Sequence, residues 1–228
     1  MKWQSFDSYE ALSAHAARLF IEAIRENPAI VLGLPTGRTP VGMYERVVNE
    51  CTCRQIVTFN LDEYVGISCD HPGSYCTYMQ QHLFSRIDID PANVHIPDGT
   101  ASDLEAECAH YERQIAQSGG LDLTFLGLGQ NGHIGFNEPG TPFESRTRVV
   151  ELTKSTRLAN AAHFADGHVP SHATTMGIGT ILESKRIVLL ASGESKRDAI
   201  ARLRGGGITP EFPASALHGH GDVIVLVA

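Results

Sequence analysis

The chain has 228 residues, of which 42% are hydrophobic and 19% charged, and its formal net charge is −8. This length and composition are typical of one globular domain that buries a full core without disulfides or a metal. No run is rich in Lys or Arg, and no apolar stretch approaches the roughly 18 residues that span a bilayer, so we expect neither nucleic acid nor a membrane as a partner.

Predicted strands and helices alternate along the chain. Short apolar runs predict strands at 29–34, 55–60, 94–96, 121–128, 186–191 and 222–227. Helical spacing of apolar residues, with caps at Ser8, Ser74 and Ser102, predicts helices at about 9–26, 40–49, 74–87, 102–117 and 194–203. We therefore expect one α/β domain over residues 1–228, with a mostly parallel sheet and helices on both faces.

The cysteines are scattered and odd in number: Cys51, Cys53, Cys69, Cys76 and Cys108. This pattern argues against a disulfide framework, and we expect five reduced thiols without a metal. The opening MKWQSFDSYEAL is not the basic stretch and apolar run of a secretion signal. Together these features predict a cytoplasmic protein.

Polar clusters follow four of the predicted strands. Thr36 to Thr39 follow the first, Asp62 and Glu63 the second, Asn131 to His133 the strand at 121–128, and Gly193 to Lys196 the strand at 186–191. Ligands of parallel sheets bind outside the carboxyl ends of the strands. The four clusters therefore predict one binding site at that edge.

The first cluster has features of an anion site. Gly37 lets the backbone approach a ligand closely, and Thr39 as N-cap before Pro40 would open a helix whose free N–H groups face an anion. Arg38 adds a guanidinium that suits a phosphate. The segment is neither a Walker loop nor GxGxxG, and an ordinary strand-to-helix turn is the alternative.

Asp62 and Glu63 leave a buried strand at the predicted edge. A carboxylate there can move a proton on carbon if burial raises its pKa. A solvated acidic turn is the alternative.

The segment from Gly129 to Pro139 holds the clearest acid–base candidates. Asn131 and Gly132 predict a turn that places His133 at the edge, and Glu138 lies close enough in the chain to fold back and orient the imidazole. Because no second His or Cys lies at ligand spacing, we expect no metal. Lys196 lies at the start of a predicted helix, where a positive charge is destabilising unless an anion compensates it. A solvated surface lysine is the alternative interpretation.

Several motifs together resemble the glucosamine-6-phosphate deaminases: LGLPTGRTP, FNLDEYVGI followed by HPGSY, DLTFLGLGQNGHIGFNEPG, SRTRVVELTKSTRLANA, and TMGIGTIL followed by SGESK. They occur in order from about Leu32 onward. The resemblance implies a single Rossmann-like, doubly wound α/β domain that converts glucosamine 6-phosphate to fructose 6-phosphate and ammonia without a cofactor. It also implies a mobile lid at about 150–172.

The resemblance also implies roles for individual residues. Asp62 matches the base that shuttles a proton between C2 and C1, His133 the group that opens the sugar ring, and Glu138 the carboxylate that supports it. Asn131 stands where some members have Asp. Thr36, Gly37, Arg38, Thr39 and Lys196 match phosphate-site positions.

Other departures from the family pattern lead to further expectations. Many members have Arg at the position of Ala162 and Gly at that of Arg38, so we hypothesise that Arg38 supplies the missing charge. Allosteric members carry Lys where this chain has Val150, and a longer tail. We therefore expect no activation by N-acetylglucosamine 6-phosphate, and a monomer or small homo-oligomer.

Three alternatives share parts of this pattern. A deaminase for the galactosamine epimer shares most of the motifs. A 6-phosphogluconolactonase would not need the carboxylates at Asp62 and Glu63. A non-catalytic sugar-phosphate sensor would share the fold, although the acid–base set here is intact.

Overall fold

The computed structural model describes residues 1–48, 50, 52–161, 164 and 167–228. Its main feature is a seven-stranded sheet in the order β1-β10-β9-β6-β2-β3-β5, in which every neighbouring pair is parallel. The strands span Lys2–Ser5 (β1), Val31–Leu34 (β2), Val57–Asn60 (β3), Val94–His95 (β5), Leu123–Gly127 (β6), Arg186–Ala191 (β9) and Val223–Val227 (β10). The predicted α/β fold class is confirmed, and the edge strand β1 is an addition to it.

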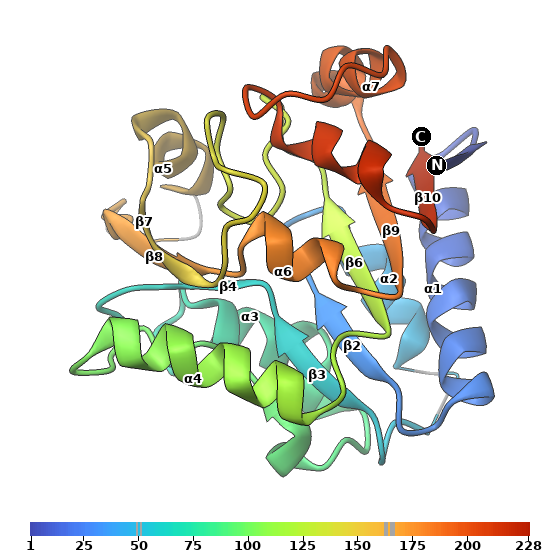
Figure 1. Ribbon diagram of the computed structural model, residues 1–228. Coiled ribbons are helices and arrows are strands. Elements are labelled where there is room, and N and C mark those ends of the chain that lie inside the picture. Colours follow the sequence, from blue (N-terminus) through green and yellow to red (C-terminus); the bar gives the residue numbers. More distant parts are fainter. Residues whose placement is uncertain (49, 51, 162–163, 165–166) are drawn as a thin grey trace.

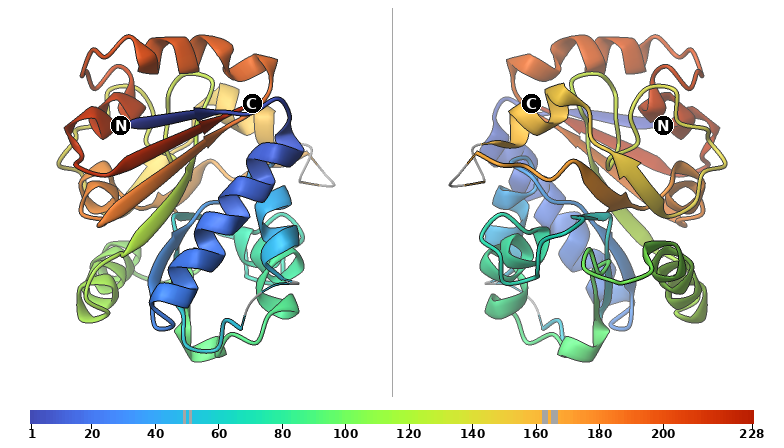
Figure 2. Two further views of the ribbon diagram at one scale, coloured as in Figure 1. Left: turned by 90° about the vertical axis from the view of Figure 1, so that its right-hand side faces the viewer. Right: turned by 90° about the vertical axis from the view of Figure 1, so that its left-hand side faces the viewer.

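Helices cover both faces of the large sheet (Figures 1 and 2). The α-helices of the described residues span Tyr9–Glu26 (α1), Val41–Val47 (α2), Tyr75–His82 (α3), Leu104–Gln117 (α4), Lys154–Asn160 (α5), Ile178–Leu182 (α6) and Arg197–Arg204 (α7), and all but α5 pack on the large sheet. Short 3-10 turns cover Phe84–Arg86, Pro91–Asn93, Glu194–Lys196 and Pro213–Gly219. The helix expected at 74–87 therefore ends earlier as an α-helix, and the one expected at 194–203 begins with a 3-10 turn.

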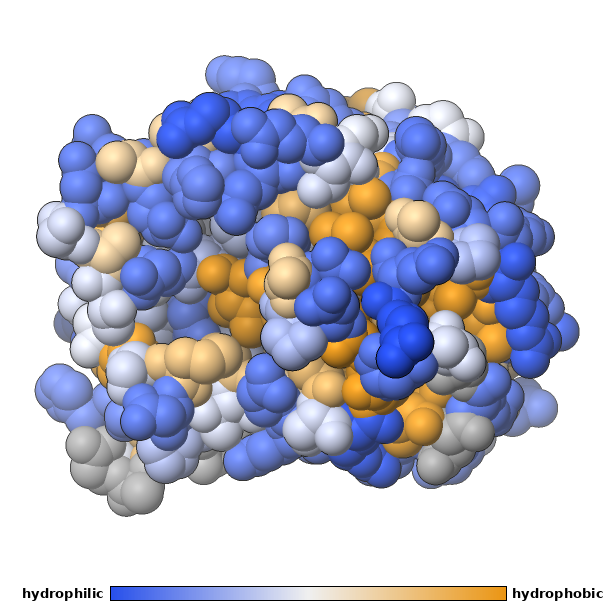
Figure 3. Space-filling view, turned by 90° about the horizontal axis from the view of Figure 1, so that it is seen from below, coloured by the Kyte–Doolittle hydropathy of each residue, from blue (hydrophilic) through white to orange (hydrophobic). Residues whose placement is uncertain are grey.

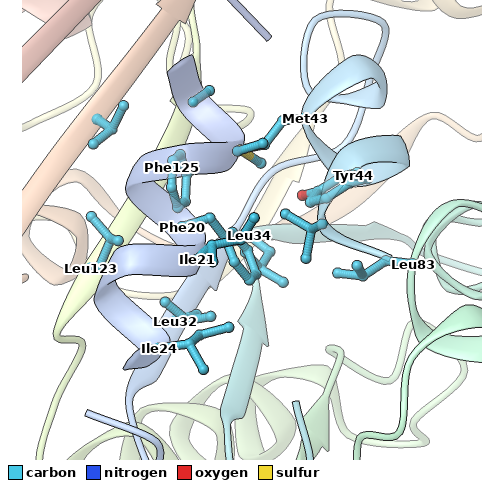
Figure 4. Packing of buried hydrophobic residues seen from close by; sticks show 14 of the residues in the cluster. Phe20, Ile21, Ile24, Leu32, Leu34, Met43, Tyr44, Leu83, Leu123 and Phe125 are labelled. Carbon is cyan, nitrogen blue, oxygen red and sulfur yellow. The ribbon is translucent and has the colours of Figure 1, made fainter. Parts of the chain in front are cut away.

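Successive residues of a strand point to opposite faces of the sheet, and they form two separate cores, one on each face. On one face α1, α2 and α3 pack on side chains such as Leu32, Phe125 and Leu190 (Figure 4). On the other, α4, α6 and α7 pack on Phe59, Leu126 and Leu189. This two-sided burial explains why the strands are continuous apolar runs in the sequence.

A second, three-stranded antiparallel sheet is the main feature that the sequence did not predict. Its order is β4-β8-β7, with β4 at Asp62–Tyr64, β7 at Arg148–Glu151 and β8 at His172–Thr175. Figure 1 shows α5 beside β7 and β8, apart from the helices that cover the large sheet. The segment expected to be a lid, 150–172, thus contains α5 between two strands of this small sheet, and its mobility stays a prediction.

The expectation of five reduced thiols is wrong for two of them. Cys69 and Cys76 form a disulfide, with their Cα atoms 5.0 Å apart. Cys53 and Cys108 are buried, and Cys51 lies outside the described residues. The pairing escaped prediction because Cys69 and Cys76 meet only when the loop before α3 folds back on the start of that helix.

The surface carries both polar and apolar side chains, as the ordinary composition of the chain leads us to expect. In the face shown in Figure 3, apolar side chains reach the surface in separate patches between hydrophilic ones. Among the helices of the described residues, none has the length and apolarity needed to cross a membrane.

Candidate active site

The candidate site is a pocket of about 350 Å³ at the point where the strand order reverses. From β2 the chain adds β3 and β5 on one side, and it then returns to add β6 and β9 on the other. Loops that follow β2 and β6 diverge at such a switch point and leave a crevice. The pocket is lined by eight of the nine predicted site residues: Thr36, Gly37, Arg38, Thr39, Asp62, Asn131, His133 and Lys196. The structure thus brings the four clusters together at one edge of the sheet, and their binding role stays a prediction.

Three tyrosines hold the loop after β2, and sequence reasoning missed all of them. The Tyr44 hydroxyl donates to the Pro35 carbonyl at 2.6 Å, and the Tyr78 hydroxyl donates to the Gly37 carbonyl at 2.6 Å. The Tyr9 hydroxyl lies 3.1 Å from the carbonyl oxygen of Thr39. Gly37 has a φ of 94°, which favours glycine.

The start of α2 differs from the prediction in its capping. Pro40, not Thr39, is the N-cap residue, and no side chain of the cap makes a hydrogen bond. The N–H of Gly42 instead donates to the Tyr9 hydroxyl at 2.8 Å. This N–H is thus already satisfied by a hydroxyl of α1.

Asp62 and Glu63 are neighbours with different surroundings. Both carboxyl groups are buried, but Asp62 lines the pocket, whereas Glu63 accepts the backbone N–H groups of Tyr64, Tyr75 and Cys76 at 2.7 to 3.0 Å. Glu63 thus anchors the start of α3, so only one carboxyl of the predicted pair faces the site.

Burial changes the acidity of Asp62. Loss of solvation, followed by the nearby charge of Glu63, raises the pKa of Asp62 to about 8. A carboxyl with a pKa in this range can both accept and return a proton near neutral pH.

The turn after β6 holds His133 through Asn131. The Asn131 Oδ1 atom lies 2.8 Å from His133 Nδ1 and accepts the His133 backbone N–H at 3.1 Å. Glu138 Oε2 accepts from Asn131 Nδ2 at 2.6 Å and is 3.9 Å from His133 Nδ1. Glu138 was expected to fold back and orient the imidazole. The structure places it beside His133 with the Asn131 amide between the two groups, and its role stays a prediction.

Two further features fix this segment. A Cβ at Gly129 would lie 2.4 Å from the His133 ring, so only glycine leaves room for the imidazole. The buried Asn137 side chain donates to the carbonyls of Ile134 and Met176 at 2.8 and 2.9 Å and accepts from Arg148 at 2.9 Å. Asn137 thereby ties the turn to β7 and the end of β8.

Two cationic groups line the pocket, although the whole chain is acidic. Lys196 is half-buried, and loss of solvation lowers its pKa. Burial is also the first cause that lowers the pKa of His133; the Glu138 charge opposes this effect and the Lys196 charge adds to it. Arg38 lines the same pocket, while Ala162, where a lid arginine was expected to be missing, lies outside the described residues.

The fold is shared with solved structures of low sequence identity. A 6-phosphogluconolactonase from Thermotoga maritima superposes with a TM-score of 0.78 at 22% identity, covering 99% of this chain and 98% of that one. At this identity the likeness shows a shared α/β fold and nothing about activity.

Sequence comparison then gives the family. The model of the family described as "Glucosamine-6-phosphate isomerases/6-phosphogluconolactonase" matches residues 5–225, and the chain belongs to this family. A glucosamine-6-phosphate deaminase of Lysinibacillus sphaericus is 50% identical, covering 99% of this chain and 98% of the relative. Glucosamine-6-phosphate deaminase 1 of Bacillus subtilis is 51% identical, covering 100% and 96%. A solved structure described as a monomeric glucosamine-6-phosphate deaminase has a TM-score of 0.97 at 51% identity, covering 100% and 97%.

Proposed function

We propose that the protein is a glucosamine-6-phosphate deaminase, which converts D-glucosamine 6-phosphate and water to D-fructose 6-phosphate and ammonia. The observation behind this proposal is that one pocket is lined by Asp62, His133 and Lys196, which come from three different parts of the chain. These groups provide a carbon base, a ring-opening acid–base and an anion site. The roughly 50% identity to relatives named for this activity supports the same reaction.

The phosphate group would bind at the loop after β2. The hydroxyls of Thr36 and Thr39 and the guanidinium of Arg38 offer hydrogen bonds, and Lys196 adds a second positive charge across the pocket. A bound dianion would also offset the cost of half-burying Lys196. This local concentration of positive charge is what an anionic substrate requires of a chain whose net charge is −8.

His133 would open the sugar ring. Ring opening removes a proton from the C1 hydroxyl and returns one to the ring oxygen, so a single group that gives and takes protons near neutral pH is sufficient. A neutral imidazole meets this need, and burial favours the neutral form of His133.

Asp62 would perform the carbon chemistry. The carboxylate takes the C2 proton of the open-chain sugar and delivers it to C1, while a proton passes from the amino group to the C1 oxygen, so that C1 becomes CH₂OH and a C=N bond remains at C2. Water adds to that carbon and ammonia leaves. Proton transfers and water suffice for every step, so we expect no cofactor. The raised pKa of Asp62 makes it a stronger base toward carbon than an exposed aspartate.

Other properties follow as part of the same proposal. Closure of the segment 150–172 would exclude water from the open-chain intermediate. We expect a monomer or small homo-oligomer, in line with the monomeric relative of 51% identity. A cytoplasmic location, and the absence of activation by N-acetylglucosamine 6-phosphate, stay predictions.

A coupled assay of ammonia release tests the proposal, with glucosamine 6-phosphate and galactosamine 6-phosphate compared side by side. Release with formation of fructose 6-phosphate from the first substrate is the expected result. Preference for the second would give the activity of the epimer enzyme. Release from neither, with retained binding, would point to a sugar-phosphate sensor and would contradict the proposal.

A further inference from the structure

Two threonines of the segment 150–172 contact Glu138. Thr153 is the N-cap residue of α5, and Thr156 lies in its first turn. The Thr156 hydroxyl donates to Glu138 Oε1, and the Thr153 hydroxyl is 3.4 Å from the same oxygen. Glu138 is therefore joined to the helix that lies between β7 and β8.

Of the two threonines, Thr156 makes the stronger hydrogen bond to Glu138. The Thr153 oxygen already accepts the Thr156 backbone N–H as part of the helix cap, and its single hydrogen has Ser155 and Thr156 within 3.0 Å as other acceptors. Thr156 is 7% exposed, and its hydroxyl points its hydrogen at the carboxylate. Charge-assisted hydrogen bonds of this kind are the stronger ones.

The other oxygen of Glu138 fixes the direction of the Asn131 amide. A carboxylate only accepts hydrogen bonds, so the Asn131 group 2.6 Å from Glu138 Oε2 must be the NH₂. The Asn131 carbonyl oxygen consequently faces His133 Nδ1, at 2.8 Å. An amide oxygen only accepts, so His133 Nδ1 must carry the proton in this arrangement.

The direction of this chain selects one form of the imidazole. With the proton on Nδ1, the free electron pair of neutral His133 is on Nε2, and His133 lines the pocket. Free histidine in water favours the opposite tautomer, with the proton on Nε2. The contacts in the structure thus hold the ring in the form that it prefers less in solution.

We propose that Thr156 is a positioning residue, which acts through Glu138 and Asn131 to hold His133 in the Nδ1–H tautomer. The tautomer that His133 needs for proton transfer then depends on the contact between α5 and Glu138. Without the Thr156 hydroxyl, the Glu138 carboxylate is held less firmly against Asn131, and the direction of the Asn131 amide depends mainly on the His133 backbone N–H at 3.1 Å. The ring then takes the other tautomer more often. This inference rests on the proposed role of His133, but the tautomer itself exists in the resting protein.

Nitrogen-15 NMR of the histidine rings measures the tautomer directly. The full chain is labelled with ¹⁵N-histidine and recorded at a pH where His133 is neutral, and its signals are assigned by their loss in His133→Gln. The expected result is a protonated Nδ1 and an unprotonated Nε2 in the wild type. Thr156→Val should shift His133 toward the Nε2–H form, and Thr156→Ser, which keeps the hydroxyl, should restore the wild-type spectrum.

Thr180→Val is a matched control. The Thr180 hydroxyl donates at 2.6 Å to Glu112, a second partly buried carboxylate, which also accepts from Thr147 and Arg146. This variant loses the same kind of bond outside the pocket, so it should lower thermal stability and leave the His133 spectrum unchanged. In kinetics, Thr156→Val should reduce kcat about tenfold, with a smaller change in KM.

Two results would overturn the inference: a wild-type His133 protonated on Nε2, or a Thr156→Val variant that keeps both the Nδ1–H tautomer and the wild-type kcat. The tautomer measurements do not depend on the substrate being glucosamine 6-phosphate. A protein that fails the ammonia assay but shows the Nδ1–H tautomer would contradict the proposed function and leave this arrangement of the turn intact.

Discussion

The two sheets supply different kinds of groups to the pocket. The loops after β2 and β9 of the large sheet provide Thr36 to Thr39 and Lys196, which suit an anion. The small sheet provides Asp62 on β4, and α5 beside it contacts Glu138. The large sheet is buried on both faces, and tyrosine hydroxyls hold the loop after β2. The turn after β6 of the large sheet also carries His133, so the groups proposed for proton transfer come from both sheets, whereas those proposed for the anion come from the large sheet alone.

The strongest test of this division is Asp62→Asn. The amide keeps the size of the side chain but cannot take the C2 proton, so kcat should fall about 10³-fold. Exchange of the C2 proton with deuterated water, measured with ammonia release, checks this. Glu63→Gln is the matched control, because its amide oxygen can still accept the N–H groups of Tyr64 and Tyr75, which bond to one oxygen of the carboxylate, and its loss of kcat should be far smaller. Retained exchange in Asp62→Asn would remove Asp62 from its role.

The pH dependence offers a second test. Asp62 must be ionised to act as a base, so kcat/KM should rise with pH until it levels off above about pH 8, the pKa of Asp62. Two pH units below that pKa it should be about a hundredfold lower. In Glu63→Gln the limb should move to lower pH, because the Glu63 charge is the second cause of the raised pKa. A limb that stays in place in this variant would contradict that electrostatic account.

On the other side of the pocket, Arg38→Gly tests the anion site. Loss of a charge-assisted hydrogen bond should raise KM about tenfold, with kcat changed much less. Arg25→Gly removes an arginine from the last turn of α1, and it should leave KM unchanged. An unchanged KM in Arg38→Gly would contradict the hypothesis that Arg38 replaces a lid arginine.

The last prediction concerns stability and not activity, at the loop between Cys69 and Cys76, which adjoins the small sheet. The Phe164 ring packs directly against Gly73 within this loop. Opening the disulfide by Cys69→Ser should destabilise the fold by roughly 2 kcal/mol, by the entropy of closing a short loop. Thermal unfolding with and without a thiol reductant checks this. The reductant should lower the Tm of the wild type but not that of Cys69→Ser, and equal effects on both would contradict the prediction.

The same contrast explains how much could be predicted from the sequence. The strands of the large sheet are buried on both faces, so they are apolar runs that can be recognised locally, and the polar residues that follow them mark the site. Asp62, His133 and Lys196 were found in this way. The small sheet joins 62–64, 148–151 and 172–175, and no local pattern indicates that these distant segments pair.

Contacts between distant segments are also why some details of the site were missed. Tyr9, Tyr44 and Tyr78 have no sequence feature that links them to the loop after β2. The Asn131 amide between His133 and Glu138 depends on a turn of a few residues whose side-chain directions the sequence does not fix. The capping of α2 was mispredicted for a similar reason, because the group that accepts the Gly42 N–H comes from α1.

The position of β1 determines how late in synthesis the large sheet can be completed. Lys2–Ser5 pairs with Val223–Val227, so β1 lies beside a strand that is synthesised more than two hundred residues later (Figure 2). β10 also separates β1 from β9. While the chain is growing, β1 therefore has no native neighbour, and the helices on that part of the sheet have an incomplete surface to cover. Completion of the sheet is a late, long-range step, and a nascent chain stalled shortly before β10 should be more sensitive to proteases near its N-terminus than the finished protein.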